Sequence, residues 1–167
     1  PFHDPGPDRT SPRDRVAAVH LDYIRHPDVI LPRDLWEKYG LVQDHEMAPY
    51  DFCYCEVCRA RFEHEFGRDP MELGDAPSDL DWRRFRWRMV TETVVELTRA
   101  AHSGGKAISA AVFPTPTIAR KLVRQEWDRW PLDLVFPMLY HSFYRESIEW
   151  IGRGVAEGVA ALPHSTA

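Results

Sequence analysis

Short apolar runs separated by longer amphipathic stretches make up most of this 167-residue chain. The apolar runs lie at residues 16–21, 107–113, 132–140 and 158–163. They do not alternate strictly between apolar and polar positions, which is typical of strands buried on both faces of a parallel sheet. In other stretches the apolar residues recur at helical spacing, so we expect helices there. These stretches are 78–105, 117–130 and 145–158.

The order of these elements indicates an α/β fold. Strands that alternate with helices at near-equal spacing form right-handed βα units on a parallel sheet. Four such strands with their helices make about half of a (β/α)8 TIM barrel. We therefore predict a partial (β/α)8 barrel over residues 16–167, an irregular arm at 1–15 and a long inserted loop at 23–77. The alternative is a free-standing doubly wound sheet of four strands, although no G-x-G-x-x-G loop follows any run.

Polar and aromatic side chains follow the predicted strands, at the edge where parallel α/β folds bind their ligands. They are Asp22, Tyr23 and Arg25 after the first run, and Tyr140, His141 and Tyr144 after the third. Asp22 lies beside an arginine that can keep it ionised, so it could act as nucleophile or base in glycoside cleavage. It could also form only an ion pair with Arg25 or cap the following loop. We take Asp22 and Arg25 as the catalytic candidates.

The other groups near these strand ends are candidates for binding a sugar. His20 alternates with Asp22 on the same face of its strand, and it fits either a sugar contact or a buried structural role. Tyr140 and His141 could stack on a sugar or hydrogen-bond to it, or they could simply pack. Together with Tyr23 and Tyr144, these residues form the predicted substrate site.

A second carboxylate is harder to find in the sequence. Glycoside hydrolysis normally uses two, about 5–5.5 Å apart for retention and about 6.5–9.5 Å apart for inversion. The ends of the second and third runs offer no Asp or Glu directly. The loops offer Glu46, Asp51 and Glu146, each of which also fits a solvated surface charge. The second carboxylate could equally belong to polypeptide outside this chain.

The three cysteines of the chain, Cys53, Cys55 and Cys58, form a C-x-C-x-x-C pattern inside the inserted loop. Three thiols on one turn can bind Zn²⁺, which prefers four Cys or His ligands. His45, His64 or a residue outside this chain could supply the fourth ligand. The alternative is three unbonded thiols without a metal. Any zinc would stabilise the loop, because nothing here matches the open site of a catalytic zinc.

Composition limits the classes of partner. The net charge is −5, and the 21 basic residues are interleaved with 26 acidic ones, so we expect no nucleic-acid partner. No apolar stretch approaches the roughly 20 residues of a membrane span, and the polar, proline-rich start does not resemble a signal peptide. We therefore expect no membrane partner and leave the localisation open. Because the sequence begins with Pro1, we expect a piece of a longer chain.

Several segments together resemble the glycosyl-hydrolase-like family 10 of TIM-barrel proteins, over about residues 16–160. They are HLDYIRHP, FCYCEVCRARFEHEFG, WRRFRWRMVTETV, ISAAVFPTP and LDLVFPMLYHSFY. The resemblance implies that HLDYIRHP is strand four of the barrel and that the later runs are strands five to seven. It also implies that Asp22 is the acidic residue of strand four, with Tyr23 and Arg25 as its companions, and that FPMLYHSFY lines the cleft.

The cysteine pattern is similar to a second family, the family 42 β-galactosidases. In their structural zinc knuckle, three cysteines of this spacing join a distant fourth. This chain departs from the glycosyl-hydrolase-like pattern because it lacks strands one to three and strand eight, so we expect the remainder of its barrel to be missing from this chain. That incomplete barrel leaves open whether this piece alone is active.

These observations predict a glycoside hydrolase fragment that cleaves O-glycosidic bonds of a poly- or oligosaccharide by carboxylate chemistry. Catalysis would need no cofactor, and the partner would be a carbohydrate. One alternative is a carbohydrate-binding or structural barrel without catalysis. Another is a metal-dependent hydrolase with Asp22, His20 and His141 as ligands, although the sequence has no H-x-H or H-E-x-x-H pattern. Because unpaired strand edges would be exposed, we also expect the isolated chain to self-associate.

Overall fold

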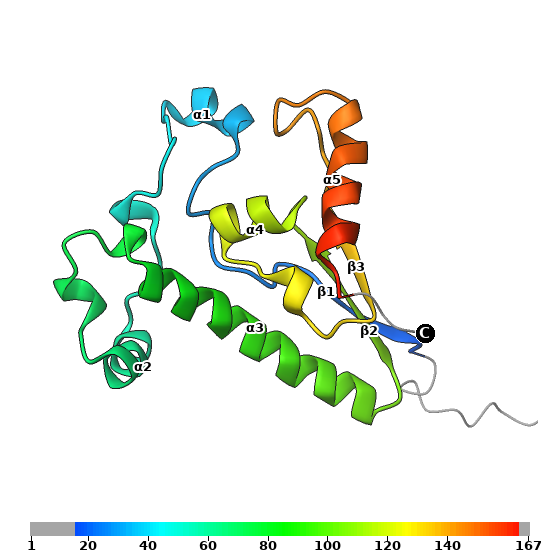
Figure 1. Ribbon diagram of the computed structural model, residues 1–167, viewed down its shortest axis with the longest axis horizontal. Helices are drawn as coiled ribbons and strands as arrows, with labels where there is room; N and C mark the ends of the chain where they lie inside the picture. The colour runs from blue at the N-terminus through cyan, green and yellow to red at the C-terminus, as the bar shows by residue number, and fades with distance from the viewer. Residues whose placement is uncertain (1–15, 164–167) are drawn as a thin grey trace, which may run out of the picture.

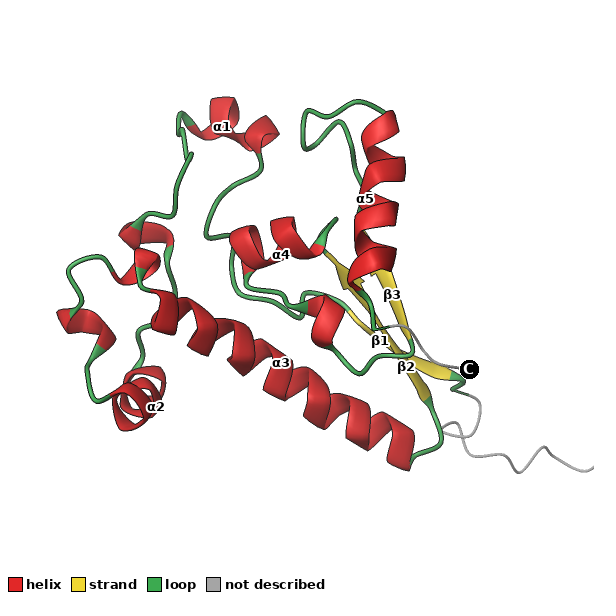
Figure 2. Ribbon diagram, in the orientation of Figure 1, coloured by secondary structure: helices red, strands yellow, loops and turns green. Residues whose placement is uncertain are grey.

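The computed structural model describes residues 16–163, which form a small parallel sheet with helices packed on it (Figures 1 and 2). The strands are β1 (Ala18–Leu21), β2 (Ala107–Val112) and β3 (Leu134–Pro137). They pair in the order β1-β2-β3, and both pairings are parallel. The α-helices are α1 (Arg33–Tyr39), α2 (Glu56–Phe66), α3 (Leu80–Ser103), α4 (Pro116–Val123) and α5 (Glu149–Ala161). Short 3-10 helices lie at Ala48–Tyr50, Pro70–Glu72, Ala76–Ser78 and Trp127–Arg129.

The main core lies on one face of the sheet. Ala110 and Val112 of β2 point into it, because alternate residues of a strand face opposite sides. They pack against Val90 and Val94 of α3 and against residues of α4. Trp127 belongs to the same core. Burial of these apolar side chains is the main force holding the helices on the sheet.

The opposite face of the sheet is uncovered in the part of the chain that the structure describes. Leu134 and Phe136 of β3 point to this face and are 60% and 54% exposed. Strand register places His20 beside Ser109, and Ser109 beside Leu134, on the same face. The predicted burial on both faces is therefore wrong for β1 and β3, and it holds only for the middle of β2.

The predicted barrel is wrong. Residues 16–163 form an open α/β domain with three strands, and the expected fourth strand at 158–163 lies mostly at the end of α5. The buried residues of α5 are Trp150, Gly154 and Gly158, four positions apart, so they share one helix face. A Cβ at Gly158 would lie 3.0 Å from the Trp127 ring, and one at Gly154 only 2.6 Å from Leu139. The small residues of α5 therefore let this helix pack closely against Leu139 and Trp127.

The predicted long helix is confirmed as α3. The Asp79 carboxylate accepts a hydrogen bond from the Trp82 backbone N–H at 2.9 Å, which caps the first turn. The helix ends at Ser103, close to its expected end, and Gly104 caps it. The stretch at 117–130 is shorter than expected: α4 ends at Val123, and the next residue, Arg124, has a φ of 62°, in the left-handed region.

The inserted loop has a small core of its own. Cys58 and Phe62 of α2 pack with Trp82 and Phe85 of α3, and the rings of Trp82 and Phe85 stack with centroids 5.5 Å apart. The predicted arm at 1–15 lies outside the described residues. Within the described part of the chain, no helix is both long and apolar enough to cross a membrane.

Candidate functional site

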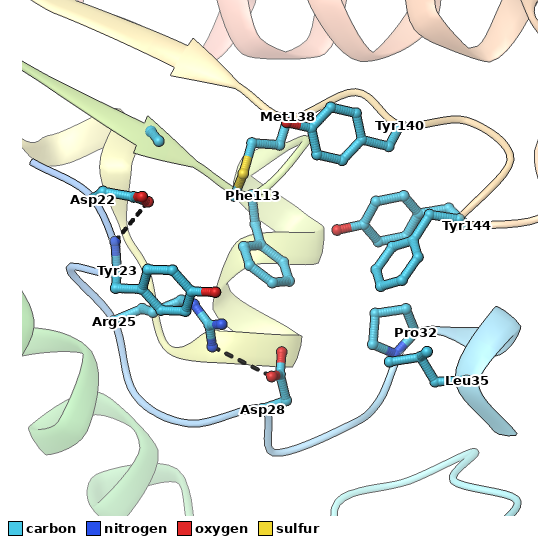
Figure 3. Close-up of a pocket in the computed structure, with 12 residues that line it drawn as sticks. Asp22, Tyr23, Arg25, Asp28, Pro32, Leu35, Phe113, Met138, Tyr140 and Tyr144 are labelled. Atoms are coloured by element: carbon cyan, nitrogen blue, oxygen red, sulfur yellow. Dashed lines mark hydrogen bonds and ion pairs between the residues drawn. The ribbon is translucent and has the colours of Figure 1, made fainter. Parts of the chain in front are cut away.

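A cavity of about 590 Å³ lies at the carboxyl edge of the sheet (Figure 3). Each strand supplies a residue just beyond its end: Asp22 follows β1, Phe113 follows β2 and Met138 follows β3. The edge of a parallel sheet where the strands end is the usual ligand site of such folds. The other residues that line the cavity are Tyr23, Arg25, Asp28, Pro32, Leu35, Ala111, Tyr140, Phe143 and Tyr144.

Five of the predicted site residues line this cavity, and Figure 3 shows them on two sides of it. Asp22, Tyr23 and Arg25 come from the loop after β1, whereas Tyr140 and Tyr144 lie across from them after β3. The structure therefore brings together groups that are more than a hundred residues apart in the sequence.

His20 and His141 do not line the cavity. The Nδ1 atom of His20 lies 2.8 Å from Ser109 Oγ, within hydrogen-bond distance, and its ring meets the Phe136 ring edge-on at 5.6 Å. His141 uses its Nδ1 to contact the Glu146 carbonyl at 3.2 Å. Neither histidine joins Asp22 in a group of metal ligands among the described residues.

The Asp22 carboxylate is exposed and faces the cavity (Figure 3). Its Oδ1 accepts a hydrogen bond from the Tyr23 backbone N–H at 2.8 Å. Tyr23 has a φ of 53°, and this local hydrogen bond stabilises the turn. Among residues 16–163, no cationic side chain lies within ion-pair distance of Asp22. The carboxylate is therefore free to meet a ligand.

Arg25 pairs with Asp28 rather than with Asp22. Its Nη1 lies 3.4 Å from Asp28 Oδ2 and donates a hydrogen bond to the His26 carbonyl at 3.0 Å. The guanidinium also lies between two rings, 5.0 Å from the centroid of Tyr23 and 5.2 Å from that of Phe113. Asp28 is the cavity carboxylate that the sequence reasoning missed. Its spacing of three residues from Arg25 was a signal that could have identified it.

The side of the cavity beyond β3 is aromatic. Tyr144 packs against Phe143 and Trp150, with ring centroids 5.5 Å apart in each pair. Burial raises the pKa of Tyr144, and the negative charge of Asp28 raises it further, so its phenol is neutral at physiological pH. Tyr140 is 61% exposed at the mouth of the site. These rings present flat apolar faces of the kind on which sugars stack.

A buried glutamine joins the loop after β1 to the end of β2. The Gln125 Oε1 accepts a hydrogen bond from the Phe113 backbone N–H at 2.9 Å, and its Nε2 donates to the Ile24 carbonyl at 3.2 Å. The loop after β1 is also hydrogen-bonded to the end of α4, because the His26 N–H donates to the Val123 carbonyl at 3.1 Å. These contacts fix the loop that carries Arg25.

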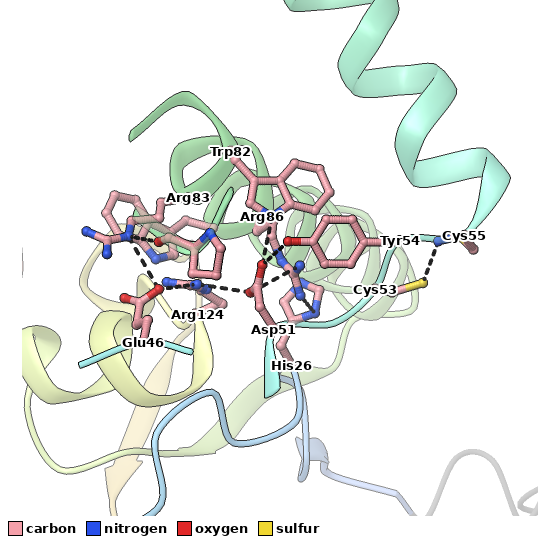
Figure 4. A network of polar contacts seen from close by, with 12 residues as sticks. His26, Glu46, Asp51, Cys53, Tyr54, Cys55, Trp82, Arg83, Arg86 and Arg124 are labelled. Atoms are coloured by element: carbon pink, nitrogen blue, oxygen red, sulfur yellow. Dashed lines mark hydrogen bonds and ion pairs between the residues drawn. The ribbon is translucent and has the colours of Figure 1, made fainter. Parts of the chain in front are cut away.

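A second group of charges is buried behind this loop (Figure 4). Asp51 accepts hydrogen bonds from Tyr54 at 2.7 Å, from Trp82 at 2.9 Å and from Arg124 at 3.2 Å. Its Oδ1 also lies 3.3 Å from an Nη atom of Arg86. We call Glu46, Asp51, Arg86 and Arg124 the buried charge cluster.

Two of the expected second carboxylates belong to this cluster and not to the cavity. Glu46 accepts a hydrogen bond from Arg124 at 2.6 Å, and Asp51 is fully buried. Glu146 is exposed and does not line the cavity either. Burial alone would raise the pKa of Asp51, but the charge of Arg86 and the hydrogen bonds from Tyr54 and Trp82 lower it. Asp51 is therefore an ionised structural group.

His26 touches the cluster from the loop that forms the cavity. Its Nδ1 lies 3.2 Å from an Nη atom of Arg86. Burial, with the charges of Arg86 and Arg124, lowers the pKa of His26 to about 4. The ring is therefore neutral at physiological pH and can accept a hydrogen bond from Arg86.

The three cysteines lie together before and in the first turn of α2. The Sγ atoms of Cys53, Cys55 and Cys58 all lie within 4.8 Å of one another, so this group could hold a metal ion. The Cys55 N–H donates to the Cys53 sulfur at 3.3 Å, and Cys55 is the N-cap of α2. Neither His45 nor His64 joins the group as the structure places them.

Comparison with family models, curated proteins and solved structures returned no match for this chain. The function must therefore be inferred from the chemistry of the cavity and the cysteine group.

Proposed function

We propose that the cavity binds an oligosaccharide and that the chain hydrolyses its glycosidic bond, with Asp22 as nucleophile or base. The observation that carries the proposal is a carboxylate that has no ion-pair partner among residues 16–163 and lies in an aromatic cavity at the carboxyl edge of a parallel sheet. The resemblance of several segments to the glycosyl-hydrolase-like family 10 points in the same direction.

Each side of the cavity has a role in this proposal. As a base, Asp22 takes a proton from the water that attacks the anomeric carbon, the glycosidic C–O bond breaks, and the leaving oxygen takes a proton from solvent water. As a nucleophile, Asp22 forms an ester bond to the anomeric carbon while the glycosidic bond breaks and the leaving oxygen is protonated by solvent water, and a second water then hydrolyses the ester. Tyr140 and Tyr144 stack on sugar rings and hydrogen-bond to their hydroxyls. Arg25 holds the loop after β1 in place through Asp28 and the two flanking rings.

The test is release of reducing sugar from a panel of polysaccharides by wild-type protein and by Asp22→Asn. We expect the isosteric change to lower the rate by at least about a hundredfold, because it removes the base or nucleophile. Glu146→Gln is the matched control, since it makes the same chemical change at an exposed carboxylate outside the cavity. Undiminished activity in Asp22→Asn would contradict the proposal.

A second candidate is a carbohydrate-binding protein without catalysis. The favouring observation is that Asp28, the other cavity carboxylate, is engaged in an ion pair with Arg25, so the described lining of the cavity offers no second unpaired carboxylate. Binding of an oligosaccharide without any release of reducing sugar would favour this candidate. Tyr140→Ala would then weaken binding, because an exposed ring at the mouth of the cavity is lost.

For the cysteine group we propose a structural zinc ion. Thiolates that share one zinc lie at most about 4.6 Å apart, since each Zn–S bond is about 2.3 Å, and the three sulfurs here are close to that arrangement. The ion would join the segment before α2 to its first turn. A water molecule or a ligand from another polypeptide would complete the four-coordinate site.

Metal analysis tests this assignment. We expect about one zinc ion per chain in wild-type protein and a large loss in Cys55→Ser. Binding of Co²⁺ should give a thiolate charge-transfer absorption that the same variant lacks. His64→Ala should change neither measurement, because His64 lies outside the group of sulfurs. Equal zinc content in Cys55→Ser would overturn the assignment.

A further inference from the structure

The charges that face the cavity do not cancel. Three charged side chains line it, the carboxylates of Asp22 and Asp28 and the guanidinium of Arg25. Arg25 is fully engaged, because it pairs with Asp28, donates to a backbone carbonyl and lies between two rings. Among the described residues, Asp22 is left as a negative charge without an ion-pair partner, and the cavity lining offers no free positive charge.

The aromatic rings add to this preference for positive charge. The faces of aromatic rings carry partial negative charge and attract cations within about 6 Å of their centres. Tyr23 and Phe113 already attract the Arg25 guanidinium in this way. Tyr140, across the cavity from Asp22, is 61% exposed and retains an open ring (Figure 3). A ligand amine placed between Asp22 and Tyr140 would meet a carboxylate and a ring face together.

We propose that the saccharide bound in this cavity carries a basic amine, so that the site prefers amino sugars over neutral sugars and rejects uronic acids. This inference rests on the proposed saccharide function and adds the substrate class to it. Asp22 pairs with the ligand ammonium, and the ring of Tyr140 covers it. A uronic acid would place its carboxylate against Asp22 without any free cation to offset the repulsion.

Binding measurements on the full chain test the inference directly. The probes are oligomers of glucosamine, of N-acetylglucosamine and of galacturonic acid, of equal length, at a pH of about 6, where amines are protonated and carboxylates are ionised. We expect the glucosamine oligomer to bind about fivefold to tenfold more tightly than the N-acetylated one. Added salt should reduce this preference, because screening weakens an exposed ion pair.

Asp22→Asn should remove the preference, so that the glucosamine oligomer binds no more tightly than the N-acetylated one. Glu146→Gln makes the same change in net charge outside the cavity and should retain the preference. Equal binding of the glucosamine and N-acetylglucosamine oligomers by wild-type protein would overturn the inference, but it would leave the saccharide function intact. Binding of none of the three oligomers would overturn both.

Discussion

The cavity and the buried charge cluster contain the same kinds of residue, yet their surroundings differ. In the cavity, Arg25 and Asp28 are 15% and 30% exposed and form one ion pair at 3.4 Å. In the cluster, Arg86 and Asp51 are 1% and 0% exposed, and Asp51 accepts hydrogen bonds from three side chains. The first pair lines a cavity and is partly open to solvent, whereas the second is enclosed by protein and stabilises the fold.

The two regions share one loop. Arg25 and His26 are neighbours in the sequence, but Arg25 lines the cavity while His26 contacts Arg86 of the cluster. The cluster therefore supports the loop after β1, which forms one wall of the cavity. The comparison teaches that an acidic residue can be assigned to chemistry or to structure only when its partners are known.

The largest expected effect comes from removing the central carboxylate of the cluster. Asp51→Ala leaves Arg86 buried without a counter-charge and Arg124 with Glu46 alone, which should lower the free energy of unfolding by about 3–5 kcal/mol. Urea denaturation followed by circular dichroism measures this loss. The control is Asp44→Ala, whose side chain is 78% exposed and should change stability by less than about 0.5 kcal/mol. An equal loss of stability in Asp51→Ala and Asp44→Ala would show that the buried charge cluster stabilises the fold no more than a surface charge does.

A smaller effect should appear as a pH dependence that comes from His26. The pKa of His26 is lowered to about 4 in the folded chain, so between that value and its usual pKa near 6.5 the unfolded chain binds the extra proton. Stability is therefore complete above pH 6.5 and falls as the pH drops toward 4, by roughly 3 kcal/mol in all. Denaturation curves across this range should show the decline.

Asp51 affects the stability of the fold over a different pH range from His26. Its folded pKa is lowered, so its contribution is present above its usual pKa and is lost only as the pH falls further, through the folded value. His26→Gln should flatten the decline between pH 6.5 and 4 and leave the loss at lower pH in place. An NMR titration of the His26 ring gives an independent check. A ring that titrates near its usual pKa would contradict the burial argument.

The position of the site residues at the edge of the sheet could be predicted from the sequence, whereas the overall architecture was predicted less well. Asp22, Tyr23 and Arg25 could be placed at a strand end because apolar runs and polar ends alternate along the chain. The fourth strand was wrong because a short apolar run fits a strand or a helix end equally well. Only contact with Trp127 shows why Gly158 belongs to a helix.

The cluster could not be predicted from local pattern. Asp51 lies far in sequence from Arg86 and Arg124, and only the packing of α3 and α4 brings their charges together. A carboxylate in a polar stretch looks like a surface charge until its partners are located. Asp28 was missed for a different reason: its partner Arg25 is local, but the sequence placed that arginine beside Asp22 instead.

The uncovered sheet face gives a third prediction, which concerns association rather than folding. Leu134 and Phe136 are more than half exposed on that face, so we expect the chain to self-associate with increasing concentration. Replacing both by Ser should weaken the association by about tenfold, measured by sedimentation velocity. Val159→Ser, at a residue 61% exposed on α5, is the control and should have little effect. A wild-type chain that stays monomeric at all concentrations would contradict this expectation.

The smallest expected effect is the stability change in Asp22→Asn. The contact that Asp22 makes within the described chain is the hydrogen bond from the Tyr23 N–H, and the amide oxygen of Asn can accept the same bond. Asn also favours such turns, so the positive φ of Tyr23 remains supported. The free energy of unfolding should therefore change by less than about 0.5 kcal/mol, which urea denaturation can measure beside Asp51→Ala.

A loss of more than about 2 kcal/mol in Asp22→Asn would place Asp22 in the structural class with Asp51, because only a carboxylate with hidden partners is that costly to neutralise. A near-zero loss combined with lost activity would assign the two aspartates opposite roles. Comparing the free energies of unfolding of the two variants therefore distinguishes a carboxylate that acts in the site from one that stabilises the fold. Asp51 would then be needed because it stabilises the loop that lines the cavity. Asp22 would be needed because its charge is available to a ligand.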